Sequence, residues 1–155
     1  MPTSLREELR QAKPFGSIAQ EAAISVSRTS ALLDHAIAEF LKSREITVTQ
    51  YNVLRILRGA GTDGLCRAEV MERMIAKVPD ATRLLDRLEE SGLIVRSRGT
   101  ADRRFVTTRI TDAGLVLLDE LDAPMLDLHH AHFALLNEAD VRTLIDLLAR
   151  VRACL

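Results

Sequence analysis

The sequence predicts a mainly α-helical chain with one small β-hairpin. Apolar residues recur at helical spacing through most of the chain. Only two short runs, residues 93–98 and 105–110, are β-prone, and the four residues 99–102 between them have the composition of a turn. With 155 residues, the chain has the length of one compact domain with helical extensions.

The composition excludes several classes of protein. With 47% hydrophobic and 28% charged residues, the chain has enough apolar surface to fold. No apolar run reaches the roughly 18 residues of a membrane span, and the first 25 residues carry three glutamates, so we expect neither a membrane segment nor a secretory signal. Two cysteines form no disulfide framework or zinc-finger spacing. We therefore expect a cytoplasmic, nucleoid-associated protein without a cofactor or metal.

Charge is distributed unevenly along the chain. The net charge is only −1, but residues 67–109 carry ten basic and seven acidic side chains, whereas residues 110–155 carry three basic and eight acidic ones. With four Phe, one Tyr and no Trp, the chain has few aromatic side chains on which the bases of a single-stranded nucleic acid could stack. Any surface that binds a polyanion is therefore expected in the middle third.

Helix signals define the first half of the chain. The first dozen residues have no strong pattern and are expected to be loosely ordered. A helix is expected from Ser17 to about residues 42–45, and a second one, opened by a capping box of Thr47 and Gln50, through Leu57. A short helix over residues 67–76 follows.

The next helix is expected to begin with Pro79 in its first turn. Its apolar stripe consists of Ala81, Leu84, Leu85 and Leu88. Gly92 provides a left-handed stop, and the predicted hairpin follows it.

Two helices complete the chain. The first begins at residues 111–114 and the second is capped by Asn137. Both have apolar seams at heptad-like spacing: Leu118, Leu121, Met125 and Leu128 in one, and Val141, Leu144, Leu148, Val151 and Leu155 in the other. Seams of this kind pack on another helix, so a second copy of the chain is the expected partner.

This order of elements predicts a winged helix-turn-helix, followed by the two C-terminal helices that are expected to pack on a second copy. In that arrangement the second helix of the pair enters the DNA major groove. A basic hairpin tip reaches the neighbouring minor groove, where a narrow groove attracts arginine. The tip here contains Arg103 and Arg104.

The sequence resembles the MarR family, the regulators of the multiple-antibiotic-resistance type. The resemblance is carried by residues 47–54 (TVTQYNVL), 82–89 (TRLLDRLE), 91–94 (SGLI), 102–104 (DRR) and 110–114 (ITDAG). It extends over roughly residues 31–148 and implies a triangular homodimer. The expected segments are an arm and dimerisation helix at 1–46, a DNA-binding domain at 47–110 and dimerisation helices at 111–155.

The resemblance also implies the site residues. Asp102 would orient Arg104 into the minor groove, and Arg103 would lie at the phosphate backbone. On the recognition helix, the residues that face DNA or support that face would be Asp80, Thr82, Arg83 and Arg87. The expected partner is double-stranded DNA with a pseudo-palindromic operator.

The same resemblance suggests a pocket for a small amphipathic or aromatic ligand between the dimer arms and the winged domain. His35, Phe40 and Tyr51 are the candidate lining residues by position. Such a ligand would relieve repression.

Other interpretations remain open. Cys66, which stands beside Arg67, suggests redox sensing, and His129, His130 and His132 suggest metal sensing. A winged-helix module that binds protein rather than DNA is a further alternative. The sequence has no catalytic triad signature, phosphate loop or dinucleotide fingerprint, so we do not expect an enzyme.

Overall fold

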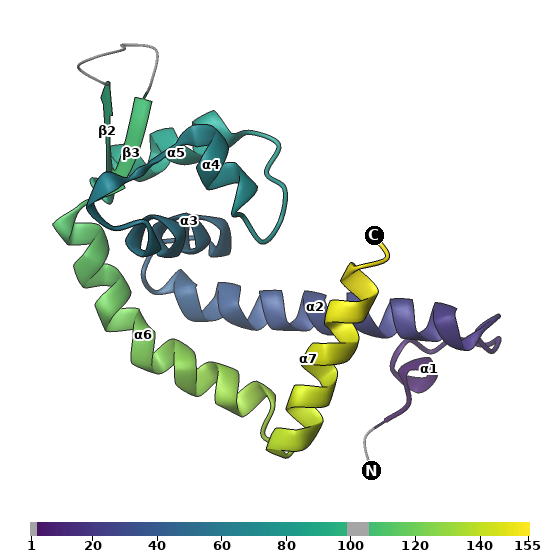
Figure 1. Cartoon of the computed structure of the whole chain (residues 1–155). Helices are drawn as coiled ribbons and strands as arrows, with labels where there is room; N and C mark the ends of the chain where they lie inside the picture. The colour runs from purple at the N-terminus through teal and green to yellow at the C-terminus, as the bar shows by residue number, and fades with distance from the viewer. Residues whose placement is uncertain (1–2, 99–105) are drawn as a thin grey trace. The chain divides into compact units, whose positions relative to one another are not determined.

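A computed structural model describes residues 3–98 and 106–155 (Figure 1). The chain divides into two compact units, residues 1–48 and residues 49–155. No helix in the described part of the chain is both long enough and apolar enough to cross a membrane.

The first unit contains α1 (Leu5–Glu8) and α2 (Ile18–Lys42). The end of α2 lies where the sequence predicts it, and Ser17 caps its start by accepting a hydrogen bond from the Gln20 amide. The expectation of loosely ordered first residues is wrong for α1. Ser4 and Glu7 form a capping box there, and the Arg6 guanidinium donates to two backbone carbonyls further along the chain. These local polar contacts order a segment that has no apolar periodicity.

The second unit begins with the elements of a helix-turn-helix. They are α3 (Val48–Gly59), the 3₁₀ turn η1 (Gly61–Asp63), β1 (Leu65–Cys66), α4 (Arg67–Glu72) and α5 (Ala81–Glu90). Helix α4 is shorter than predicted, since it ends at Glu72 rather than at residue 76. Pro79 lies outside α5, because the helix starts where the Asp80 side chain accepts from the Arg83 amide.

The hairpin is confirmed, and it belongs to a sheet with one more strand than predicted. Strand β2 (Ile94–Arg98) pairs antiparallel with β3 (Val106–Ile110), with Arg96 opposite Thr108. The two-residue strand β1 adds to the other edge of β3, in the order β1-β3-β2. A strand of two residues is too short to produce an alternating pattern, so β1 could not be predicted from periodicity.

The predicted stop after α5 is also confirmed. Gly92 has a φ of 73°, and its amide donates to the Glu89 carbonyl while the Leu93 amide donates to the Leu88 carbonyl. This turn reverses the chain directly from α5 into β2, so the recognition helix and the hairpin are joined by a short and well-defined connection.

Helices α6 (Asp112–His132) and α7 (Glu138–Arg152) end the second unit. Helix α6 starts where it was predicted, with Thr111 as its cap, and Asn137 caps α7 as predicted. Their two apolar seams differ in burial. Leu118, Leu121 and Met125 are at most 3% exposed within a single chain, whereas no residue of α7 is buried. The expectation that the α6 seam lacks a partner within the chain is therefore wrong for these three residues, whereas α7 leaves Ile145, Leu147 and Val151 about half exposed.

Candidate nucleic-acid interface

Helix α5 presents a polar face while its apolar face is buried. Leu85 and Leu88 are at most 1% exposed, and they hold the helix against the rest of the second unit. At its start, the Asp80 carboxylate accepts from the Arg83 amide over 2.9 Å. Asp80 thus serves as the helix cap, which orients the first turn of α5.

Three predicted site residues lie on the exposed face of α5. Thr82, Arg83 and Arg87 are all exposed, and Arg83 and Arg87 are one helical turn apart. The Thr82 hydroxyl accepts from the Arg67 guanidinium at 3.0 Å, so that α4 fixes the Thr82 side chain. Among the described residues, neither Arg83 nor Arg87 has an ion-pair partner. Their charges are therefore available to an external anion.

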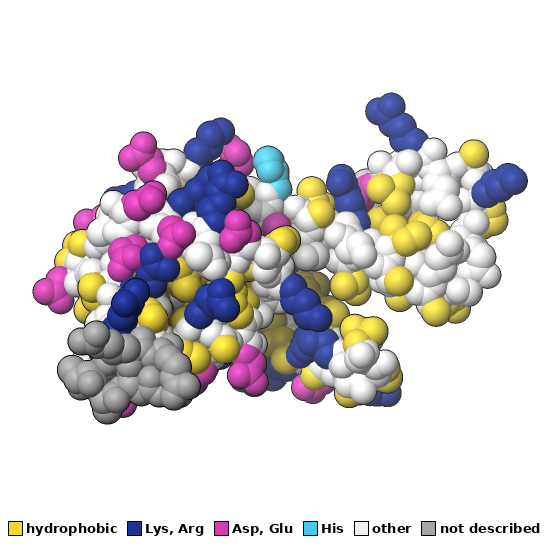
Figure 2. All heavy atoms as spheres, turned by 90° about the horizontal axis from the view of Figure 1, so that it is seen from above, with side chains coloured by type: hydrophobic (Ala, Val, Ile, Leu, Met, Phe, Trp, Pro, Cys, Tyr) yellow, Lys and Arg dark blue, Asp and Glu magenta, His cyan; other side chains and the backbone are white. Residues whose placement is uncertain are grey.

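The face that bears the hairpin, α4 and α5 is mixed in charge. Figure 2 shows Lys and Arg side chains interspersed with Asp and Glu side chains on this view, without a large patch of one sign. Interspersed acids limit nonspecific attraction to DNA, since the phosphate backbone attracts any dense basic surface. Such a face offers an anion separate cations rather than one dense basic surface.

Arg96 joins the hairpin to α5, and this contact was not predicted from the sequence. The Arg96 backbone amide and Nε donate to the two carboxylate oxygens of Glu89, each over 2.8 Å, and Nη2 reaches Asp86 Oδ1 at 2.5 Å. The hydrogen bonds from Arg96 lower the pKa of the Glu89 carboxyl, and they raise the pKa of the Arg96 guanidinium. The strand and the recognition helix are thus held together by directional, charge-assisted bonds.

A signal for this contact does exist in the sequence. Arg96 stands two residues after the buried Ile94 in an alternating strand, which places it on the inward face. A half-buried arginine at such a position needs acidic partners. Asp86 and Glu89, three residues apart on α5, provide them.

Arg109 holds the other side of the hairpin base. Its Nε donates to the Thr62 carbonyl at 2.8 Å and its Nη1 to the Ser97 hydroxyl at 2.9 Å. In the helix-turn-helix itself, Asn52 Oδ1 accepts from the Ile75 amide at 3.0 Å, which fixes the turn between α4 and α5. The hairpin tip with Asp102, Arg103 and Arg104 lies outside the described residues.

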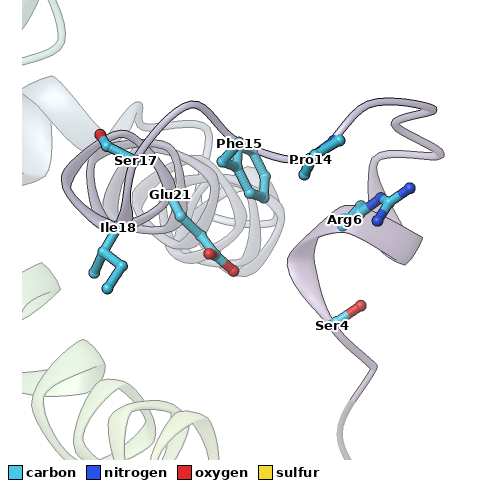
Figure 3. Close-up of a pocket in the computed structure, with 7 residues that line it drawn as sticks. All are labelled: Ser4, Arg6, Pro14, Phe15, Ser17, Ile18 and Glu21. Carbon is cyan, nitrogen blue, oxygen red and sulfur yellow. The ribbon is translucent and has the colours of Figure 1, made fainter.

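The candidate ligand residues belong to different units. His35 is exposed and Phe40 half-buried on α2, whereas Tyr51 is 7% exposed on α3, with the Arg55 guanidinium 5.9 Å from its ring centre. A hollow of about 460 Å³ opens between α1 and the start of α2, and Figure 3 shows the side chains that line it. Its lining residues are Ser4, Arg6, Pro14, Phe15, Ser17, Ile18 and Glu21, so it includes none of the three candidates.

Two of the three histidines near the end of α6 are in ring contact. The rings of His129 and His132 are 6.2 Å apart in an edge-to-face arrangement. In the described ranges, no three His, Cys, Asp or Glu side chains are grouped so that they could hold a metal ion. Cys66 is half-buried at the start of α4, where its amide donates to Glu69 at 2.7 Å, and Cys154 is exposed near the C-terminal end.

Protonation of His129 is expected to destabilise the fold. Burial, followed by the charges of His132, Arg55 and His130, lowers the pKa of His129 below 6.5. The unfolded chain therefore binds a proton at this side chain more readily than the folded chain does. Its contribution to stability is present above about pH 6.5 and is lost as the pH falls through the lower pKa of the folded state.

Urea unfolding between pH 7.5 and pH 5 should show a smaller loss of stability for His129→Gln than for the unmodified protein. Equal pH dependence of the two proteins would contradict this expectation.

Comparison with known proteins agrees with this architecture. The sequence profile of the MarR family matches residues 46–106. The HTH-type transcriptional repressor MdtR of Bacillus subtilis is 32% identical over 114 residues, which cover 72% of each chain.

Two solved structures extend the similarity to nearly the whole chain. A mutant of MarR from E. coli complexed with operator DNA has a TM-score of 0.77 at 25% identity, covering 96% of this chain and 99% of that one. The PcaV transcriptional regulator from Streptomyces coelicolor, in complex with its natural ligand, has a TM-score of 0.70 at 25% identity, covering 92% and 96%. The helix-turn-helix, the hairpin braced on its second helix and the extent of these matches show that the chain belongs to the MarR family of winged-helix, DNA-binding transcriptional regulators.

Proposed function

We propose that this regulator is a homodimeric repressor that binds a pseudo-palindromic operator and releases it when a small amphipathic or aromatic ligand binds. The observation that carries the proposal is the pair Arg83 and Arg87. Both are exposed on a helix whose other face is buried, and neither has an ion-pair partner among the described residues. Two exposed guanidinium groups one turn apart suit the base edges and phosphates of a major groove.

The other site residues have supporting roles in this proposal. Arg67 orients the Thr82 side chain, and Asp80 caps α5. The first turn of α5 therefore enters the major groove with a fixed geometry. Arg103 lies at the phosphates and Arg104 in the minor groove, held by Asp102. Residues 47–110 bind DNA, while residues 1–46 and 111–155 form the dimer.

The remaining parts of the proposal rest on the relatives. MdtR is named a repressor and PcaV was solved with its natural ligand, which supports repression relieved by a ligand. His35, Phe40 and Tyr51 are the proposed contacts to that ligand. We infer a regulatory rather than an enzymatic role, exerted at the nucleoid in the cytoplasm.

A mobility-shift titration with DNA from the promoter region of its own gene tests this function. The affinity for duplex should fall steeply between about 50 and 200 mM salt, because binding releases counterions from the phosphates. The same titration is repeated with a panel of phenolic and carboxylic compounds, at least one of which should weaken the complex. An affinity for duplex that is weak and independent of salt would instead favour a protein-interaction module.

Substitution of Leu148 by aspartate is expected to dissociate the dimer. Helix α7 exposes Ile145 and Val151 by more than half and buries no residue in the single chain, so its apolar stripe requires a partner. A carboxylate in the middle of that stripe is desolvated without a counter-charge. Sedimentation velocity at micromolar concentration should show a folded monomer for Leu148→Asp.

Leu121→Asp serves as the comparison for this experiment. Leu121 is 1% exposed within the single chain, so its replacement should unfold the protein rather than merely separate two subunits. A Leu148→Asp protein that remains dimeric would exclude α7 from the interface.

Substitution of Asp102 by alanine is expected to weaken DNA binding, although it removes a negative charge near DNA. Without Asp102, Arg104 loses the carboxylate that restrains it and must lose up to about 2 kcal/mol of side-chain entropy on binding. Counting charges alone predicts tighter binding. Duplex affinity measured at two salt concentrations decides between these two expectations. Tighter binding by Asp102→Ala would refute the orienting role of Asp102.

A further inference from the structure

An ion pair connects the helix-turn-helix with α6. Arg58, near the end of α3, places Nη1 2.8 Å from Asp122 Oδ2 and Nη2 2.8 Å from Asp122 Oδ1. Asp119, one turn earlier on α6, lies 3.4 Å from Nη1. Arg58 thus binds one carboxylate with both arms of its guanidinium and contacts a second one.

This contact is directional, unlike the apolar packing around it. Leu54 and Leu57 on α3 and Leu118 and Leu121 on α6 are all at most 1% exposed, and the hydrophobic effect that buries them has no preferred direction. A planar guanidinium facing a planar carboxylate tolerates little rotation or sliding. Arg58 therefore adds an orientation-dependent contact between α3 and α6 to the burial of these apolar side chains.

The position of α6 gives that angle a consequence. Helix α6 begins at the base of the hairpin and leads to α7 (Figure 1). Ile145, Leu147 and Val151 of α7 are about half exposed. This inference rests on the homodimer proposed above. In that dimer, α6 connects α7, which contacts the second subunit, with the helix-turn-helix that carries the recognition helix α5. A change of angle at Arg58 would be carried along the helix-turn-helix to α5.

We propose that Arg58 is a positioning residue for DNA recognition: by holding Asp122 and Asp119, it sets the separation of the two recognition helices and so the half-site spacing that the dimer accepts. The side chains of Arg58 and Asp122 are 29% and 49% exposed, so the pair contributes little to the free energy of folding. Its removal should leave the dimer folded and mainly relax its spacing preference.

The experiment measures that preference directly. A duplex of about 40 base pairs is selected from a random pool with the full-length protein, and variants with one base pair inserted or deleted at its centre are made. One extra base pair turns the second half-site by about 35° and moves it by about 3.4 Å. The spacing penalty is the ratio of the affinities for the parent duplex and the altered duplex.

Three variants probe the pair from both sides. Arg58→Lys retains the charge but has a single donor head, and Asp122→Asn retains the shape but loses the charge. Each should reduce the spacing penalty by about fivefold, the coupling expected of a partly exposed pair. The reversed pair, Arg58→Asp with Asp122→Arg, should restore much of the penalty.

Arg142→Lys is the matched control. Arg142 pairs with Glu138 within α7, so this pair links no two elements and its loss should leave the penalty unchanged. An unchanged penalty in Arg58→Lys and Asp122→Asn would overturn the inference, and so would an equal loss of affinity for every duplex. An unmodified protein that binds all spacings equally would overturn the proposed dimeric recognition itself, and this inference with it.

Discussion

Replacement of Gly114 by alanine is expected to lower the free energy of unfolding by about 2–3 kcal/mol. A Cβ at this position would lie 2.5 Å from the Leu93 carbonyl oxygen and 2.6 Å from Cγ1 of Ile110. The Leu93 carbonyl cannot yield easily, because it accepts the Thr111 amide at the junction of hairpin and α6. Urea unfolding at a fixed protein concentration measures the loss.

Gly59→Ala provides the control for this substitution. Gly59 is the last residue of α3, and a Cβ there would meet no atom within 4 Å. Because alanine restricts the unfolded chain and favours the helix, Gly59→Ala should be neutral or stabilising by up to about 1 kcal/mol. Equal stabilities of the two variants would show that the contact of α6 with the hairpin is looser than the structure indicates.

The double substitution Arg83→Ala with Arg87→Ala is expected to weaken operator binding strongly without unfolding the protein. Each arginine should contribute about 1–3 kcal/mol to the affinity, which amounts to a combined loss of roughly 30-fold or more. Both side chains are exposed and unpaired among the described residues, so the urea midpoint should change little. Fluorescence anisotropy with the selected duplex measures the affinity.

A second double substitution separates contact from net charge. Arg150→Ala with Arg152→Ala removes two positive charges from the last turn of α7, which is not part of the helix-turn-helix. Its affinity for duplex should fall far less than that of the α5 variant. If both double variants lose the same affinity, then α5 acts only through general electrostatic attraction.

The sequence by itself determined the elements whose signals are local. The stop at Gly92, the caps Thr111 and Asn137, and the hairpin strands around residues 94–98 and 106–110 could all be predicted. Each depends on backbone dihedrals and hydrogen bonds within a few residues, which a short stretch of sequence specifies. The exposed face of α5 with Arg83 and Arg87 follows from the same helical periodicity.

Only the tertiary structure decided which polar side chains are paired and which apolar seam is covered. Arg96 with Glu89 and Asp86, and Arg58 with Asp122, join residues from different elements, the second pair 64 positions apart. The seams of α6 and α7 have similar spacing in the sequence, yet one is buried and the other is not. Helical periodicity specifies which side chains share a face, but the burial of that face depends on where the chain places a second surface against it.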